Sequence, residues 1–192
     1  LGKDFENVWG KVAPKSGRVK MVSELIDSSV MPGMQGGPLM HVIAGKAVAF
    51  EEALKPEYKT YCENIISNAQ CLSEKLTQLG YSIISGGTDT HLVLIDLSNK
   101  DISGKKAEAV LEEAGITTNK NMVPFDKRSP LVTSGIRIGT PALTTRGMGN
   151  EEMIIIAELI NRVISDFNSE STIRGVRQEI FDLCKNYPIY KD

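Results

Sequence analysis

Two short segments of this chain carry residue types that could bind anions. In the first, Gly36-Gly37-Pro38, adjacent glycines leave backbone N–H groups free of side-chain cover. Pro38 suits the first turn of a helix, and apolar residues recur at helical spacing over 39–54. Free amides that converge on a helix N-terminus favour a phosphate. A tight turn that merely starts a helix is the alternative.

The second segment is Gly135-Ile136-Arg137-Ile138-Gly139. Its alternation predicts a short strand that buries both isoleucines on one face and projects Arg137 from the other. The flanking glycines clear space for a planar ligand beside the guanidinium. Arginine is well shaped to bind a carboxylate through two parallel hydrogen bonds, so the segment indicates a carboxylate site. A solvated charge on an edge strand is the alternative.

Four motifs of the chain resemble those of the serine hydroxymethyltransferase family, whose members are fold-type I pyridoxal-phosphate enzymes. They occur in the family's order and at its spacing, and the resemblance extends along nearly the whole chain. Residues 1–28 match the family least. The motifs are Ser29 to Ala49, Gly86-Gly87-Thr88-Asp89-Thr90-His91, Gly115 to Asn121, and Ser134 to Gly147.

The resemblance implies roles for particular residues. Arg137 is expected to hold the carboxylate of the substrate amino acid. The backbone of Gly37, and less directly that of Gly36, is expected to contact the phosphate of pyridoxal 5'-phosphate. In the family this contact reaches across to the neighbouring subunit, so the resemblance implies a homodimer with a cofactor site shared between subunits.

The resemblance also implies a site for tetrahydrofolate as co-substrate. The family usually has phenylalanine where this chain has Leu131, which weakens the side-chain part of the match but not a backbone contact. A loop ordered by asparagine turn chemistry and a rigid proline is the alternative. The residues expected at this site are Asn121, Ser129, Pro130 and Leu131.

The family motif Thr-Thr-His-Lys-Thr, whose lysine binds the cofactor covalently, does not occur in this sequence. The resemblance gives no such role to Lys46, Lys120 or the other lysines, so it assigns no catalytic residue here. We therefore expect the chain to be the C-terminal part of the enzyme. It would carry half of an active site and be inactive by itself.

For the complete enzyme, the resemblance implies reversible conversion of serine and tetrahydrofolate to glycine and 5,10-methylenetetrahydrofolate. One alternative is the small domain of another fold-type I enzyme, such as an aminotransferase, which also has a carboxylate-binding arginine. The run from Gln35 to His41 argues against it. A second alternative is a non-catalytic dimerisation or binding module, although the Arg137 and Gly37 segments show no sign of decay.

Composition suits a globular protein. With 192 residues, of which 41% are hydrophobic, the chain can bury one moderate core and a smaller appendage. A net charge of −2 gives no electrostatic reason to expect nucleic acid or an anionic membrane as partner, and no apolar run reaches the length of a membrane span. The few cysteines and histidines do not cluster as a metal or disulfide framework. We expect no metal, reduced thiols and a cytoplasmic location.

The order of the predicted helices and strands indicates an α+β fold. Residues 1–55 are expected to form the end of the large cofactor-binding domain, as a loop, the Gly-Gly-Pro segment and a helix, and 56–80 a long connecting helix. Residues 81–192 are expected to form the C-terminal small domain, a small sheet with helices packed on one face. The patterns predict strands at 81–84, 91–97, 116–118 and 135–139, and helices that begin near Met21, Ser103, Asn150 and Ser171.

Overall fold

The computed structural model describes residues 3–190 of the chain. Two compact units divide between Leu54 and Lys55, so the long helix Pro56–Gln78 belongs to the second unit. The first two and last two residues of the predicted domains lie outside the described residues. The assignment of 1–55 to the end of a larger domain stays a prediction.

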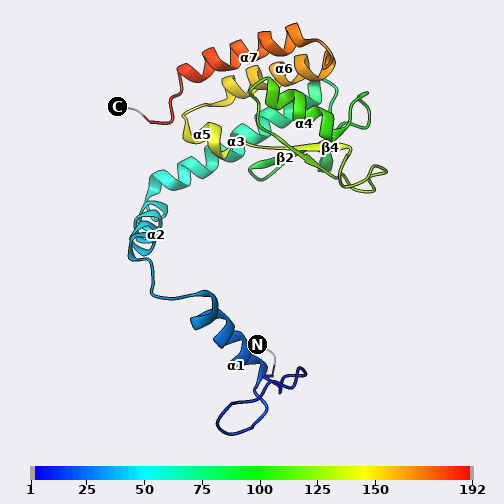
Figure 1. Cartoon of the computed structure of the whole chain (residues 1–192). Coiled ribbons are helices and arrows are strands. Elements are labelled where there is room, and N and C mark those ends of the chain that lie inside the picture. Colours follow the sequence, from blue (N-terminus) through cyan, green and yellow to red (C-terminus); the bar gives the residue numbers. More distant parts are fainter. Residues whose placement is uncertain (1–2, 191–192) are drawn as a thin grey trace. The chain divides into compact units, whose positions relative to one another are not determined.

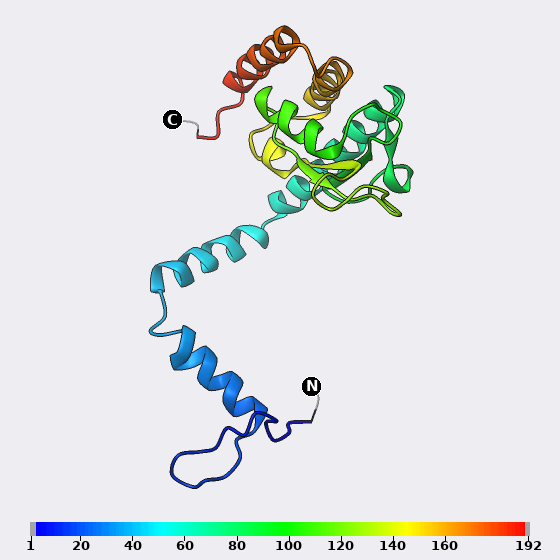
Figure 2. The ribbon, with the colours of Figure 1, turned by 45° about the vertical axis from the view of Figure 1, so that its right-hand side comes forward.

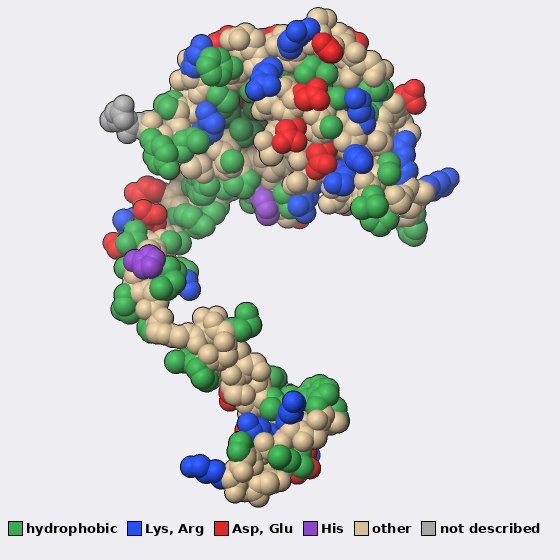
Figure 3. Space-filling view, in the orientation of Figure 1, with side chains coloured by type: hydrophobic (Ala, Val, Ile, Leu, Met, Phe, Trp, Pro, Cys, Tyr) green, Lys and Arg blue, Asp and Glu red, His purple; other side chains and the backbone are tan. Residues whose placement is uncertain are grey.

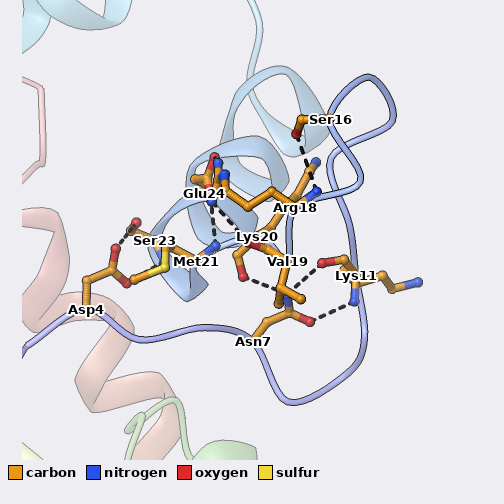
Figure 4. A network of polar contacts seen from close by, with 10 residues as sticks. All are labelled: Asp4, Asn7, Lys11, Ser16, Arg18, Val19, Lys20, Met21, Ser23 and Glu24. Atoms are coloured by element: carbon orange, nitrogen blue, oxygen red, sulfur yellow. Dashed lines mark hydrogen bonds and ion pairs between the residues drawn. The ribbon is translucent and has the colours of Figure 1, made fainter.

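Polar contacts order the loop that begins the first unit (Figure 4). The amide nitrogen of the buried Asn7 side chain donates to the backbone carbonyls of Lys11 and Lys20, at 2.8 and 2.7 Å. Two isolated antiparallel bridges turn the loop back on itself. The Arg18 guanidinium bonds both carboxylate oxygens of Glu24 and so lowers the pKa of Glu24 to about 2. The irregular sequence of this loop therefore has a defined conformation.

Three helical segments follow in the first unit: α1 (Val22–Ser28), η1 (Ser29–Met34) and α2 (Met40–Ala53). The prediction that Pro38 opens a helix is wrong, because Leu39 keeps an extended backbone and the first helical residue is Met40. Every residue of α2 is exposed although its sequence is mainly apolar, and hydrophobic side chains are visible along this unit in Figure 3. An apolar helix without a covered face is typical of a segment that packs against further protein.

The second unit confirms the predicted α+β fold. Its sheet has the order β1-β2-β4-β3, and all neighbouring strands are antiparallel. Helices α4, α6 and α7 lie on the same side of the sheet in Figures 1 and 2. The strands are β1 (Ser82–Ile83), β2 (Leu92–Asp96), β3 (Asn119–Asn121) and β4 (Gly135–Gly139). The helices are α3 (Pro56–Gln78), η2 (Ile84–Gly86), α4 (Gly104–Glu113), α5 (Pro141–Thr145), α6 (Asn150–Ser165) and α7 (Glu170–Lys185).

The hydrophobic core lies between the sheet and its helices. Side chains alternate along a strand, and Val93, Ile95 and Ile136 are 0% exposed whereas Arg137 is exposed. Burying one such aliphatic side chain contributes about 1.5–3 kcal/mol. The apolar residues of α3 recur at intervals of three and four and supply Ala69, Leu72 and Leu76, all fully buried. One face of the sheet therefore carries the core, and the other face is left for Arg137.

The start of α4 follows the sequence prediction, but the strand after it does not. Ser103 caps α4, since its hydroxyl accepts a hydrogen bond from the backbone three residues on. The strand predicted at 116–118 is wrong, because Gly115, at φ +83°, and a hydrogen bond from the Ile116 N–H to the Leu111 carbonyl complete the end of the helix. Pairing with β4 therefore starts three residues later, as β3.

The last two helices begin close to the predicted positions, Asn150 and Ser171, but the assignment of Asn150 as the cap of its helix is wrong. Asn150 is the first helical residue of α6, because the Glu152 carboxylate instead accepts a hydrogen bond from the Gly149 N–H at 2.7 Å. Ser169, and not Ser171, caps α7 with its side chain. Asn150 and Ser171 therefore both lie within the first turn of their helices, one or two residues after the cap.

Arg146 anchors the C-terminal end of α7. Its guanidinium donates from Nε to the Tyr187 carbonyl at 2.8 Å and from a terminal nitrogen to the Cys184 carbonyl at 3.2 Å. Both carbonyls lie at the end of the helix, beyond its regular ladder of hydrogen bonds, and that of Cys184 also accepts from the Tyr187 N–H at 3.1 Å. The Tyr187 hydroxyl also donates to Glu152 at 2.6 Å, and this bond lowers the pKa of Glu152. The Arg146 side chain thus joins the end of α7 to the connection between α5 and α6.

Replacing Arg146 by alanine should loosen the last turn of α7. Two charge-assisted hydrogen bonds to carbonyls would be lost, so amide hydrogen exchange over residues 183–187 should accelerate about tenfold or more. The matched control is Arg174→Ala, since Arg174 bonds to Glu170 on its own helix and, among residues 3–190, to no other residue. Equal exchange in the two variants would mean that Arg146 does not hold the helix end.

Candidate functional site

Arg137 occupies the sheet face that points away from the helices. On β4 it lies between Leu94 of β2 and Asn119 of β3, which are its paired residues in the two neighbouring strands. Within residues 3–190, the Arg137 side chain makes no hydrogen bond or ion pair. Each of the other arginines, by contrast, donates at least one hydrogen bond; they are Arg18, Arg128, Arg146, Arg162, Arg174 and Arg177. The planar donor group of Arg137 is therefore available to a ligand.

Asn121 lies on the same face of the sheet as Arg137. It pairs with Gly135, and Asn119, two residues earlier, pairs with Arg137, so both asparagines and the arginine point to one side. The Asn121 side chain donates to the adjacent Met122 carbonyl at 2.7 Å. The structure thus brings together two residues that the sequence assigned to different ligands, the amino acid and the folate.

The predicted Ser129-Pro130-Leu131 segment lies in the loop that joins β3 to β4. All of it is exposed, and Leu131 is 77% exposed. The Ser129 carbonyl accepts hydrogen bonds from the N–H groups of Val132 and Thr133, each at 2.9 Å, so the segment forms a defined turn. Backbone and side-chain groups of this turn are accessible to a ligand.

Asp126 is the organising residue of the same loop. One carboxylate oxygen accepts from the Ser134 hydroxyl at 2.6 Å and from the Arg128 N–H at 2.9 Å. The other accepts from the N–H groups of Ser134, at 2.8 Å, and Val123, at 3.3 Å. The hydrogen bond from the Ser134 hydroxyl, with the three backbone donors, lowers the pKa of Asp126 to about 2.

Sequence reasoning did not single out Asp126. An aspartate side chain often accepts a hydrogen bond from the backbone N–H two residues further along the chain, so the bond from the Arg128 N–H to Asp126 could have been anticipated. Its bond to Ser134 spans eight residues of loop and has no sequence signal. Asn119, which faces Arg137 across the strand pair, was likewise not among the predicted residues.

Gly36 and Gly37 lie in the first unit and present open backbone. A Cβ atom added to either glycine would meet no atom within 4 Å, and neither has a positive φ. By contrast, a Cβ at Gly135 would lie 2.7 Å from the Ile95 carbonyl oxygen, so the fold itself requires that glycine. The fold of the described chain does not require glycine at positions 36 and 37.

The donor set at these glycines fits a phosphate group. Among the described residues, the amides of Gly36 and Gly37 make no hydrogen bond, and the first N–H groups of α2 follow shortly after them. Free amides without side-chain cover, next to a helix N-terminus, are the usual protein contacts of a phosphate. The geometry at Gly36 and Gly37 is therefore compatible with the predicted phosphate contact, which stays a prediction.

A metal site needs several convergent ligand side chains. Within residues 3–190 no group of three or more histidine, cysteine, aspartate or glutamate side chains is arranged to hold a metal ion. Of the helices in the same range, none combines the length and the apolar character that crossing a membrane requires.

Comparison with known proteins agrees with these features. Residues 8–160 match the family model for serine hydroxymethyltransferase. A serine hydroxymethyltransferase from Chlorobium phaeovibrioides (strain DSM 265 / 1930) is 59% identical over 194 residues, an alignment that covers 98% of this chain and 44% of that protein. The chain thus spans less than half the length of this curated relative. Because the family model covers most of the chain, the chain belongs to the serine hydroxymethyltransferase family.

Proposed function

We propose that the complete protein converts serine and tetrahydrofolate reversibly to glycine and 5,10-methylenetetrahydrofolate. Family membership supports this reaction, and the curated relative carries the corresponding name. The observation that carries the proposal is Arg137, the arginine whose guanidinium has no partner among the described residues. The chain spans 44% of the relative, so the activity is proposed for the complete protein.

Arg137 binds the carboxylate of serine or glycine in this proposal. Two parallel N–H donors fix the plane of the carboxylate as well as its position, which a single-point contact cannot do. A fixed carboxylate would set how the other bonds at the serine Cα are oriented. The contribution of this side chain to the reaction is therefore orientation.

Gly36 and Gly37 contact the phosphate of pyridoxal 5'-phosphate through their open backbone. When bound, that cofactor supplies an electron sink for the electrons of the cleaved Cα–Cβ bond. The lysine that binds it covalently in the family is outside this sequence. In the family this contact reaches across to the neighbouring subunit, so we propose that the cofactor that Gly36 and Gly37 approach belongs to the neighbouring subunit of a homodimer.

Asn121 and the Ser129-Pro130-Leu131 turn contact tetrahydrofolate. Asn121 shares the sheet face of Arg137, and the turn is exposed, so neither is obstructed by the helices of the second unit. Leu131 takes part through its backbone.

We further propose that residues 1–55 belong to the large domain of the complete protein. The rest of that domain would cover the exposed apolar surface of α2. We also propose that the protein is cytoplasmic.

The test is a pair of assays on the complete protein. With serine and tetrahydrofolate it should release glycine in equal amount to methylenetetrahydrofolate. With serine or glycine and a 2-oxo acid it should transfer no amino group, since an aminotransferase would do so. Amino transfer without folate-dependent glycine formation would overturn the proposed function.

A further inference from the structure

The Asp126 carboxylate joins the two ends of the loop between β3 and β4. Val123, which donates to it, lies two residues after β3, and Ser134, which donates twice, directly precedes β4. The Arg128 amide is a fourth donor, from the middle of the loop. One side chain therefore closes a loop whose ends are already held in neighbouring strands.

A second set of hydrogen bonds fixes the part of the same loop that leads into β4. The carbonyls of Thr133 and Val132 accept from the N–H groups of Gly104 and Lys105, at 3.0 and 2.9 Å. These are the first amides of α4, which have no partner within their helix. The exposed Ser129-Pro130-Leu131 turn lies between the Asp126 bonds and these helix bonds, so both determine where it stands relative to the sheet.

We propose that Asp126 is a positioning residue for tetrahydrofolate, acting through the Ser129-Pro130-Leu131 turn. The inference rests on the proposed function, because the turn is assigned to the folate site there. Asp126 itself is part-buried and all its bonds are to the loop, so it does not need to touch the ligand.

Aspartate is required at this position because every neighbouring group is a donor. A carboxylate offers two acceptor oxygens, whereas an asparagine amide offers one oxygen and an NH₂ group that only donates. In Asp126→Asn, the NH₂ group would face at least one backbone N–H, which cannot accept a hydrogen bond from it, whereas the Ser134 hydroxyl could turn to accept one. The substitution keeps the shape of the side chain and removes one or two of the four bonds that close the loop.

The experiment uses the complete protein carrying Asp126→Asn, with Asp101→Asn as matched control. Asp101 is an exposed carboxylate, so the control makes the same change of charge. Titration calorimetry would measure the Kd of glycine alone and the Kd of tetrahydrofolate with glycine present. Hydrogen exchange would follow the amides of Val123 and Ser134. A second variant, Ser134→Ala, removes only one of the four bonds and keeps the experiment informative if Asp126→Asn folds poorly.

We expect Asp126→Asn to weaken tetrahydrofolate binding about tenfold, to leave the glycine Kd within about twofold and to speed exchange at both amides. Ser134→Ala should shift the same quantities less, and Asp101→Asn should shift none. Faster exchange with unchanged folate binding would overturn the positioning role, as would equal weakening of glycine and folate. An unaltered protein that bound no tetrahydrofolate would instead overturn the proposed function itself.

Discussion

Replacing Arg137 by alanine in the complete protein should lower kcat/KM for serine by about two orders of magnitude or more. The variant loses both hydrogen bonds to the substrate carboxylate, and charge-assisted bonds contribute about 1.5–3 kcal/mol each. Because the side chain has no partner among the described residues and is exposed, its removal should not destabilise the sheet. Steady-state kinetics with serine at saturating folate would measure the effect.

Two further variants make the Arg137 result specific. Arg137→Lys should recover little activity, since an ammonium group lacks the planar pair of donors. Arg174→Ala should leave the kinetics unchanged, because among residues 3–190 Arg174 bonds only to Glu170 on the surface of α7. Near-normal serine kinetics in Arg137→Ala would mean that this arginine is a solvated surface charge.

Replacing Gly37 by valine should weaken retention of pyridoxal phosphate in the complete protein without unfolding it. A β-branched side chain would cover the backbone that the phosphate approaches, whereas within this chain it would meet open space. Dialysis followed by absorbance of the retained cofactor would measure the loss. Gly175→Val is the matched control, since Gly175 is also open and lies on α7.

A mixed dimer tests whether Gly37 serves the partner subunit. One inactive variant carries Gly37→Val and the other lacks the cofactor lysine of the complete protein. If the glycine acts across the interface, a mixed dimer holds one site with both lesions and one with neither. About a quarter to a half of the activity should then return on subunit exchange. No return of activity, with exchange demonstrated, would place the phosphate contact within one subunit.

The fold of the second unit could be predicted because its apolar patterns are unambiguous. The long helix predicted over 56–80 and the strand predicted from the alternation around Arg137 are both confirmed, as α3 and β4. Boundaries near helix ends were harder, because several polar residues compete for each cap. The N-caps of α6 and α7 are Gly149 and Ser169. Gly149 donates to the Glu152 side chain and the Ser169 side chain accepts from Thr172, and residue spacing alone does not reveal these bonds.

The candidate site divides in the same way. The ligands predicted for Arg137 and for the glycine pair rest on residue type, local pattern and family resemblance, and they stay predictions; the structure shows that both sites are exposed. The position of Asn119 opposite Arg137 depends on strand register, and the bond from Ser134 to Asp126 depends on the path of a long loop. Such contacts arise only when distant segments fold together, and a single sequence carries no local trace of them.

The most direct test of the central claim pairs Arg137→Ala with a ligand that lacks the carboxylate. Affinities of serine and of ethanolamine, which is serine without its carboxylate, would be measured by titration calorimetry for the unaltered protein and for the variant. If Arg137 binds the carboxylate, the substitution should weaken serine about a hundredfold and leave ethanolamine within about twofold. Equal weakening of both ligands, or of neither, would contradict the account.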